Sequence, residues 1–596
     1  MASVRLPQFL RATGLVVAIS FAYWGSLDSP FLFDDADAVV NNATLRGPSL
    51  LSALVPPADG SATTGRPLVN LSLAIDRALY GDNVRGYHVT NLAIHAGAAL
   101  ALFGLLRWIF KRDEKLSSVD SLAWLGALLW AVHPLQTETV VSIAQRTELL
   151  CGSLYLATLY AFLRGAAASS RVWLAASLVA CLAGMAAKEV MVTAPVVVLL
   201  LDRTFMAGSF AAAWRVRRTY YLLLASTWLL LAALVLSRGG MRGEAAGFGL
   251  GVTPWSYLLT QADAIVLYVR LVLWPYPLVL DYGSEVVRSL SDVAWQAALV
   301  VGALGAMIWA LVRRPVAGFF GVAFFLILAP SSSFVPLVTQ TIAEHRMYLP
   351  LAVLLTGFVV SLRGRLRWLL VPVAVAWGGL TVLRMRDYRD PVTIWSDTVA
   401  KRPANPRAHH NLALAYQAQG DAAAAHQRFA RVIDLRPDYA PARYNWGVAL
   451  LARGRRVEAA EQLDAAARVS PALRHEPKFT EAQFELGRLA EREGDLAAAE
   501  FRWGETVRLA PSHAAARARL GLLLARSERL EPAAEQFRAL IAARPDDADA
   551  HANLGNILLL LGRPSEAISH YEEALRLRPG DPRAAENIRL AREALR

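Results

Sequence analysis

Residues 28–46 read DSPFLFDDADAVVNNATLR, and the chain is organised around this stretch. It follows an apolar run, 9–27, and places two adjacent carboxylates, Asp34 and Asp35, just beyond it. Charged groups beside the end of a membrane helix cost free energy unless they contact water, a cation or a bound molecule. The stretch therefore predicts a helix that crosses a membrane and leads into an acidic turn with a function.

The 596-residue chain has two parts of different composition. It is 55% hydrophobic with a mean hydropathy of +0.35, whereas soluble domains are about 45–50% apolar. Long apolar runs fill the first part, while the second alternates Ala, Leu and charged residues. We predict a membrane domain at 1–386, a connecting or capping helix at 387–406 and a repeat array at 407–596.

The apolar runs predict an all-α membrane domain of about 11 spans. A twelfth segment, 256–273, carries Gln261, Asp263 and Arg270 in an apolar background, which is typical of a helix lying in the membrane interface. Leaving it out of the count puts every dense Lys/Arg cluster on one side, as the positive-inside rule requires. The expected spans are 9–27, 88–110, 120–133, 148–164, 172–187, 190–206, 219–237, 294–312, 316–331, 348–362 and 368–384.

The net charge of +12 lies mostly in the membrane part, which carries about +10. This distribution suits basic loops beside anionic lipid, and no nucleic-acid-binding motif accompanies it, so nucleic acid is excluded as a partner. The two cysteines, Cys151 and Cys181, lie inside apolar runs and predict core packing, not a metal site or a disulfide framework.

On this topology the unusual polar residues of the membrane part all face one compartment. They lie in five outer loops or at the adjoining ends of spans. The groups are Asp34, Asp35 and Asp37, with His88 and His95 following; His133, Glu138 and Arg146; Lys188 and Glu189; Trp274 to Pro277; and Glu344, His345, Arg346 and Tyr348.

The ordered set of these motifs resembles the transmembrane and TPR repeat-containing O-mannosyltransferase-like family, a branch of the GT-C membrane glycosyltransferases. The matching stretches are Phe33-Asp34-Asp35, Arg66-Pro67-Leu68, Tyr87-His88, Asn91 to His95, His133-Pro134, Lys188-Glu189, Trp274-Pro275 and Glu344 to Pro350. The resemblance implies a GT-C-type fold, a polyprenyl-phosphate sugar donor and inverting transfer to a hydroxyl group on the outer side. An Ala- and Arg-rich composition favours a bacterial inner membrane, with the array in the periplasm.

The acidic pair supplies the general base in this interpretation. One carboxylate removes the proton of the acceptor hydroxyl, and the other orients it. From the position of the pair in related enzymes we favour Asp35 as the base, with Asp34 beside it. The structural alternative is that both residues only cap a turn or a helix.

Arg346, with His345, is expected to bind the donor phosphate, because a guanidinium group holds phosphate with two hydrogen bonds. Lys188 is expected to add a second cation. The structural alternatives are ion pairs of Arg346 with Glu344 and of Lys188 with Glu189.

The remaining candidates are expected to line the same cavity: His88, His95, His133, Glu138, Arg146, Glu189, Glu344 and Tyr348. Structural alternatives stay open, since His88 and His95 can be interior histidines, His133 can end its helix, and Glu138 can pair with Arg146. We expect no cofactor and no essential metal. Asp34, Asp35 and Asp37 offer hard oxygen ligands, but nothing else in the loop completes a metal motif.

The second part carries a fixed period. Six prolines, Pro403, Pro437, Pro471, Pro511, Pro545 and Pro579, are spaced by 34, 34, 40, 34 and 34 residues, and Gly420, Gly454, Gly494 and Gly562 precede four of them by 17. A period of 34 is the signature of tetratricopeptide (TPR) repeats, so we predict an α-solenoid of about five repeats. Such arrays present a groove for a protein partner.

These features together predict a membrane glycosyltransferase that moves a sugar, with mannose expected, from a polyprenyl phosphate to Ser or Thr of an exported protein. Its expected partners are the lipid-linked donor, membrane lipids, and a protein acceptor or partner in the TPR groove. The alternative is a membrane-anchored TPR scaffold without catalysis, which leaves five polar outer loops unexplained. A lipid-sugar transporter is disfavoured, because its ionisable groups belong near the bilayer midplane.

Overall fold

The computed structural model describes residues 2–112, 118–237, 247, 251–333, 335–337, 339–362 and 367–595. These residues form an all-α protein, and no strand occurs among them. They divide into two compact units, 1–412 and 413–596. Arg363 and Arg365, which the sequence assigns to an inner basic loop, lie outside the described residues.

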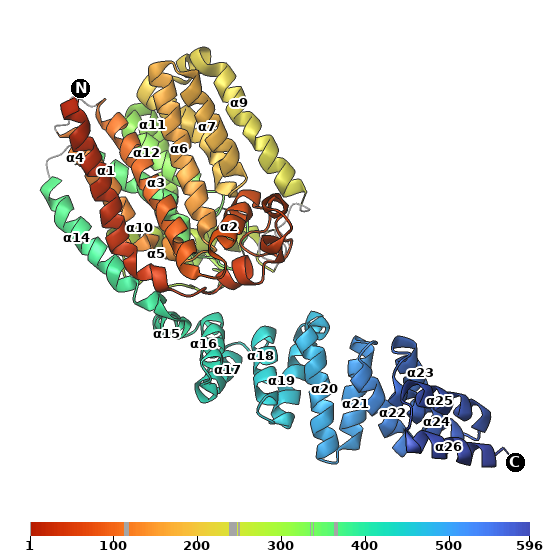
Figure 1. Ribbon diagram of the computed structural model, residues 1–596. Coiled ribbons are helices and arrows are strands. Elements are labelled where there is room, and N and C mark those ends of the chain that lie inside the picture. The colour runs from red at the N-terminus through yellow and green to blue at the C-terminus, as the bar shows by residue number, and fades with distance from the viewer. Residues whose placement is uncertain are drawn as a thin grey trace. The chain divides into compact units, whose positions relative to one another are not determined.

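The first unit is a bundle of apolar helices (Figure 1). Each of the eleven predicted spans coincides with one of them. The helices are α1 (Ala2–Tyr23), α3 (Val84–Phe110), α4 (Val119–Ala131), α6 (Arg146–Ala168), α7 (Arg171–Met185), α8 (Ala194–Asp202), α9 (Phe210–Leu236), α11 (Ala294–Arg313), α12 (Pro315–Leu328), α13 (Tyr348–Ser361) and α14 (Arg367–Arg384).

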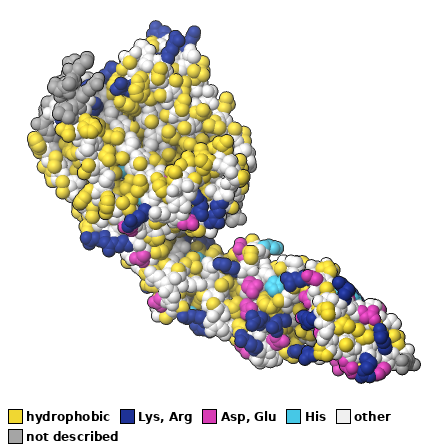
Figure 2. Space-filling model, in the orientation of Figure 1, with side chains coloured by type: hydrophobic (Ala, Val, Ile, Leu, Met, Phe, Trp, Pro, Cys, Tyr) yellow, Lys and Arg dark blue, Asp and Glu magenta, His cyan; other side chains and the backbone are white. Residues whose placement is uncertain are grey.

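Eight segments of the described chain are long and apolar enough to cross a membrane, and α4, α7 and α12 are shorter apolar helices. Large apolar side chains also cover the outside of the bundle (Figure 2). Phe21 is 75% exposed, Leu229 73% and Val301 70%. An apolar surface of this extent fits lipid contact and not water. The unit is therefore a multi-pass membrane domain.

Helix α10 (Pro254–Leu273) is among the eight by length and composition, yet its contacts place it across one end of the bundle. Near its start, the Tyr257 hydroxyl donates to the Ser331 carbonyl at 2.8 Å. Near its end, the Tyr268 hydroxyl accepts from the Ala343 amide at 3.0 Å. Both partners belong to the segment that joins α12 to α13, so the two ends of α10 lie at the same end of the bundle. This geometry agrees with the interfacial helix expected from the sequence.

All the predicted outer loops meet at that end of the bundle, together with the short helices α2 (Pro67–Tyr80) and α5 (Thr137–Val141). Hydrogen bonds join loops that are far apart in the sequence. Asp35 contacts the segment between α5 and α6, and Glu138 contacts His345 before α13. The five loops therefore share one end, as the positive-inside argument predicts.

The connecting segment contains helix α15 (Pro391–Lys401), which packs on these loops. The buried Trp395 ring lies edge-to-face with Phe33, with ring centroids 5.3 Å apart. The Lys401 ammonium donates to the Leu278 carbonyl at 2.9 Å. This connection is thus part of the first unit.

The second part consists of paired helices followed by a last helix, α26 (Pro582–Glu593) (Figure 1). Helix α16 begins in the first unit and ends in the second. The pairs are α16 (Pro406–Ala418) with α17 (Ala422–Leu435), α18 (Ala440–Leu451) with α19 (Arg456–Val469), α20 (Pro477–Arg492) with α21 (Leu496–Leu509), α22 (Ala514–Arg526) with α23 (Leu530–Ala543), and α24 (Ala548–Leu560) with α25 (Pro564–Leu577).

Small residues let the two helices of a pair approach each other. A Cβ added at Gly487 would lie 2.5 Å from the Trp503 ring, and one at Gly555 would lie 2.6 Å from the Tyr571 ring. The turn between helices needs a left-handed residue, with φ of +83° at Gly420. Glu528, the one departure from the glycine pattern, adopts the same conformation with φ of +58°.

Candidate functional site

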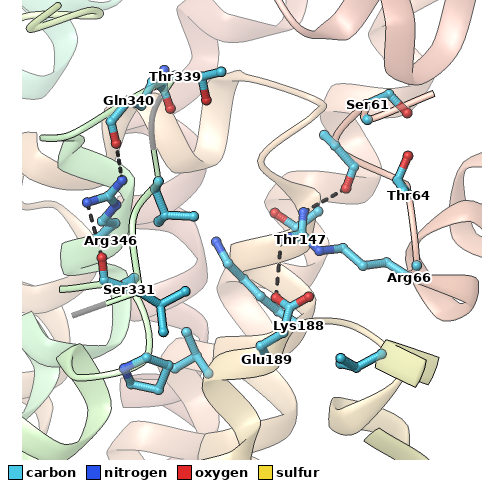
Figure 3. A pocket seen from close by; sticks show the side chains of 18 of the residues that line it. Ser61, Thr64, Arg66, Thr147, Lys188, Glu189, Ser331, Thr339, Gln340 and Arg346 are labelled. Atoms are coloured by element: carbon cyan, nitrogen blue, oxygen red, sulfur yellow. Dashed lines mark hydrogen bonds and ion pairs between the residues drawn. The ribbon is translucent and has the colours of Figure 1, made fainter. Parts of the chain in front are cut away.

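A cavity of about 370 Å³ opens where the loops of the bundle meet. Its polar lining comes from five separate stretches: the acidic turn after α1, the segment before α2, the start of α6, the link between α7 and α8, and the segment before α13. Its charged or ionisable lining residues are Asp34, Arg66, Lys188, Glu189, His345 and Arg346. Figure 3 shows Arg66 on one side, Arg346 on the other, and Lys188 with Glu189 between them.

The two adjacent aspartates have different surroundings. Asp35 is buried, and its carboxylate accepts from the Ala144 amide at 2.7 Å, the Ser142 hydroxyl at 3.0 Å and the Leu32 amide at 3.0 Å. Asp34 is half-buried and lines the cavity, and its carboxylate accepts no hydrogen bond from the residues the structure describes. Phe33, at φ of +50°, turns the chain immediately before the pair.

Burial raises the pKa of both carboxyl groups. For Asp34 the pKa rises to about 7, and the charge of Asp35 adds to the effect of burial. For Asp35 it rises only to about 6, because the hydrogen bonds from Leu32 and Ala144 stabilise the ionised form. Of the two aspartates, Asp34 is therefore the one whose residue lines the cavity. The preference for Asp35 as base is not supported by this placement.

Arg346 is held by carbonyl groups and not by a carboxylate. Its guanidinium donates to the Thr341 carbonyl at 2.9 Å, to the Gln340 carbonyl and to the Ser331 carbonyl at 3.3 Å. Carbonyl groups orient a guanidinium without neutralising its charge. Arg346 thus brings a positive charge to the cavity wall from a fixed position.

Two further cations line the cavity with carboxylate partners. Lys188 pairs with Glu148, and Arg66 pairs with Glu189 at 3.5 Å. The Arg66 Nε is buried and has no hydrogen-bond partner among the described residues. Arg66, Lys188 and Arg346 thus surround a space whose size suits a small polar group.

His345 lines the cavity, and Glu138, which does not line it, holds the His345 ring in place. Its Nδ1 lies 2.7 Å from Glu138 Oε1, and its backbone amide donates to Glu138 Oε2 at 3.1 Å. Burial raises the pKa of Glu138 to about 8 and holds the pKa of His345 well below its usual value. The pair is therefore uncharged as a whole near neutral pH.

Comparison with known proteins gives two kinds of match. Tetratricopeptide repeat families match residues 416–471, 463–514, 502–546 and 518–582. Human protein O-mannosyl-transferase TMTC4 is 27% identical over 494 residues, covering 70% of this chain and 66% of its own length. Protein O-mannosyl-transferase F38B6.6 of Caenorhabditis elegans is 23% identical over 463 residues, covering 72% of this chain and 64% of its own.

The chain is similar to the TMTC-type protein O-mannosyl-transferases. Its matches to TMTC4 and F38B6.6 extend over most of this chain, beyond the repeats alone. It spans about two thirds of the length of these relatives.

In this TMTC-like chain several residues expected to line the cavity hold the loops and helices together instead. His88 Nε2 bonds the Ser29 carbonyl at 2.9 Å, and His133 caps a short turn by accepting from the Leu135 amide at 3.1 Å. His95 lies between the Tyr348 hydroxyl and the Ala131 carbonyl, each at 3.0 Å. The cavity-lining prediction was wrong for His88, His95, His133 and Tyr348, because neighbouring helices bury them.

The same correction applies to three charged residues. Arg146 is fully buried and donates to Asp76, to Asn91 at 2.8 Å and to the Tyr87 carbonyl at 2.9 Å, which ties α6 to α2 and α3. Glu344 accepts from the Val279 amide at 2.6 Å and the Tyr282 hydroxyl at 2.7 Å. Glu138 supports the cavity from behind His345 but does not line it.

The structure also bears on the ion pairs that were the structural alternatives. Lys188 pairs with Glu148, Glu189 pairs with Arg66, and Glu344 bonds Val279 and Tyr282. Arg66 is a cavity residue that the predicted site omitted, although its Arg-Pro-Leu motif had been noted. The position of the motif directly before α2, at the loop end of the bundle, was the signal that could have identified it.

One wall of the cavity is apolar and comes from a membrane helix. Leu231, Leu234 and Val235 of α9 line it. Within the described part of the chain, no group of three or more His, Cys, Asp or Glu is arranged to hold a metal ion. The cavity therefore combines three cations, the carboxyl groups of Asp34 and Glu189, and an apolar side formed by α9.

Proposed function

We propose that this protein is a membrane glycosyltransferase that transfers a sugar, with mannose expected, from a polyprenyl-phosphate donor to a Ser or Thr hydroxyl of a protein. The observation that carries the proposal is that Asp34 and Arg346 line one cavity at the loop end of the bundle. The names of the relatives TMTC4 and F38B6.6 support protein mannosylation.

In this reaction the donor phosphate lies against Arg346, with Arg66 and Lys188 adding positive charge. The cations stabilise the phosphate as it leaves with the electron pair of the broken sugar–oxygen bond. The polyprenyl chain leaves the cavity along the apolar side formed by α9.

Asp34 acts as the general base. It accepts the proton of the acceptor hydroxyl while the hydroxyl oxygen forms a bond to the anomeric carbon. The phosphate departs from the opposite face, so the configuration of the sugar inverts. Asp35 holds the turn that carries Asp34, and Glu138 fixes the ring of His345 at the cavity wall.

The TPR array binds the acceptor protein or a partner that delivers it. Paired helices of this kind form extended surfaces for peptides or helices. We place the loop end of the bundle and the array on the non-cytoplasmic side of a bacterial inner membrane, because the topology predicted from the sequence puts the dense Lys/Arg clusters on the opposite side.

The test uses the full chain in lipid nanodiscs with mannosyl-phosphoryl dolichol or mannosyl-phosphoryl undecaprenol and Ser/Thr-containing peptides. We expect release of the polyprenyl phosphate and a peptide heavier by one hexose, both measured by mass spectrometry. A scaffold without catalysis would release neither product, while still binding a protein through the array.

A further inference from the structure

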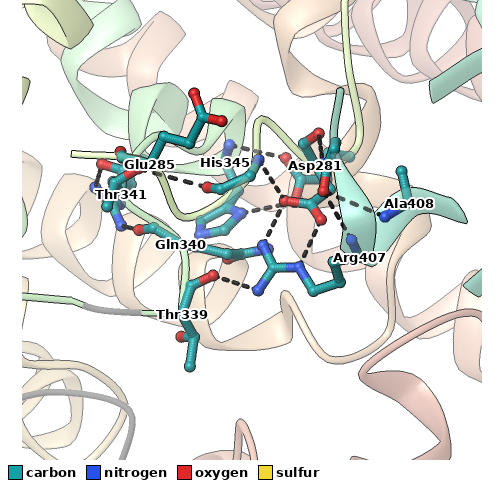
Figure 4. A network of polar contacts seen from close by, with 12 residues as sticks. Asp281, Glu285, Thr339, Gln340, Thr341, His345, Arg407 and Ala408 are labelled. Carbon is teal, nitrogen blue, oxygen red and sulfur yellow. Dashed lines mark hydrogen bonds and ion pairs between the residues drawn. The ribbon is translucent and has the colours of Figure 1, made fainter. Parts of the chain in front are cut away.

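Arg407, in the first turn of α16, is bound to the loops beneath the cavity. Its Nε donates to Asp281 Oδ2 at 2.6 Å, and its Nη2 donates to Asp281 Oδ1 (Figure 4). The Asp281 side chain is fully buried. Asn405 adds a bond to the Asp281 carbonyl at 3.0 Å. A buried carboxylate with this bidentate partner is fixed in one geometry.

The third donor of the same guanidinium reaches the cavity wall directly. Arg407 Nη1 donates to the carbonyl of Thr339, which lines the cavity. The next two carbonyl groups, of Gln340 and Thr341, accept from Arg346. Arg407 therefore holds the segment that orients the Arg346 guanidinium.

A second route runs through the turn that contains Asp281. From this turn, Val279 and Tyr282 donate to Glu344, which precedes His345 and Arg346 in the sequence. The Thr341 hydroxyl donates to the Glu285 carbonyl at 3.2 Å, beside the same turn. Residues 339–346 are thus bonded near one end by Arg407 and near the other by residues of the turn that contains Asp281.

We propose that Arg407 is a positioning residue for the cavity: it fixes segment 339–346 and thereby the direction of the Arg346 guanidinium. Arg407 is not among the residues that line the cavity, and its hydrogen bonds to Asp281 and to the Thr339 carbonyl connect it to the cavity wall. Its consequence for donor binding rests on the proposed function. A residue in the first turn of the first repeat helix is then part of the support of the phosphate site.

The first measurement needs no substrate. A single reactive cysteine is introduced as Gln340→Cys in the cavity wall, because both native cysteines are buried. We expect Arg407→Gln to raise the rate at which a water-soluble maleimide labels Cys at position 340 by about tenfold or more. The substitution leaves the buried Asp281 carboxylate without its partner, so segment 339–346 is held less firmly. Arg436→Gln, an exposed arginine paired with Asp438 at 3.2 Å, is the matched control and leaves the rate unchanged.

A double variant, Arg407→Gln with Asp281→Asn, distinguishes local loosening of the segment from unfolding of the protein. It removes both charges, so no buried carboxylate is left unpaired. We expect a thermal unfolding midpoint close to that of the unsubstituted protein, together with the raised labelling rate. Equal labelling rates in the unsubstituted protein and both Arg407 variants would overturn the proposal.

The second measurement is the binding of dolichyl phosphate to the full chain in nanodiscs. We expect the dissociation constant to rise about tenfold in Arg407→Gln, less in Arg407→Lys, and not at all in Arg436→Gln. If labelling rises while binding is unchanged, Arg407 holds the segment without positioning Arg346, and the proposal fails. If the unsubstituted protein binds no polyprenyl phosphate, the proposed donor is wrong, and the labelling rates still test the support of the segment.

Discussion

Asp34 and Arg346 line one cavity, although the first follows helix α1 and the second precedes α13. Asp34 accepts no hydrogen bond from a described residue, while Arg346 is oriented by backbone carbonyl groups. A carboxylate and a fixed cation facing one space can take a proton and bind an anion there.

Asp35→Asn should lower stability, because Asp35 supports the turn. An asparagine amide nitrogen cannot accept the hydrogen bonds that both carboxylate oxygens now accept from Leu32, Ser142 and Ala144. We expect a loss of about 1–3 kcal/mol in the free energy of unfolding. Thermal unfolding of the detergent-solubilised chain measures it, with Asp37→Asn as the exposed control. A stable Asp35→Asn variant would contradict the supporting role.

The rate of transfer should depend on pH through Asp34. Burial and the charge of Asp35 raise the pKa of Asp34 to about 7, so the base is protonated and inactive below that pH. We expect kcat/KM to rise as the pH increases through about 7. The residual rate of Asp34→Asn should lack this dependence. If kcat/KM of Asp34→Asn still rises with pH, the pH dependence belongs to another group, such as Glu138, whose pKa is raised by burial to about 8.

Arg346→Lys should weaken donor binding while keeping the positive charge. A lysine ammonium cannot reproduce the planar set of donors that bonds the carbonyl groups of Gln340 and Thr341, so its charge is less well placed. We expect KM for the lipid-linked donor to rise about tenfold. Arg270→Lys, at an exposed position of α10, is the control. Equal KM values in the two variants would remove Arg346 from the phosphate site.

Gly487→Ala should destabilise the repeat array. The new Cβ would lie 2.5 Å from the buried Trp503 ring, so one of the two helices must move. We expect a cost of about 1–3 kcal/mol, visible as earlier unfolding of the array by circular dichroism. Gly504→Ala, on the facing helix, meets no atom within 4 Å and should be neutral or stabilising. Equal effects of the two substitutions would contradict the packing described.

The sequence predicts well what depends on periodicity and on charge asymmetry. The proline and glycine period places the repeat helices, and the left-handed Glu528 shows that the backbone keeps the repeat geometry even where glycine is missing. The Lys/Arg clusters predict which loops share an end of the bundle, because the positive-inside rule puts all loops that carry such clusters on one side. The expected interfacial position of α10 agrees with the contacts of Tyr257 and Tyr268.

The sequence cannot decide which polar residue faces the cavity, because contacts between distant segments decide it. Asp35 rather than Asp34 is turned inward by Ser142 and Ala144, which lie on another loop. Lys188 pairs with Glu148, which is 40 residues away in the sequence on α6. His95 is enclosed by Tyr348 and Trp130, and nothing in its local sequence shows that.

The central claim is tested most directly by sugar transfer in Asp34→Asn compared with Asp37→Asn. Both substitutions remove one carboxylate from the same turn, but Asp37 is exposed and bonds only Asn41 among the described residues. We predict that mass spectrometry shows the hexose on the peptide with the unsubstituted protein and with Asp37→Asn, and its loss with Asp34→Asn. Transfer that persists in Asp34→Asn at the rate of Asp37→Asn would contradict the assignment of the cavity as the catalytic site.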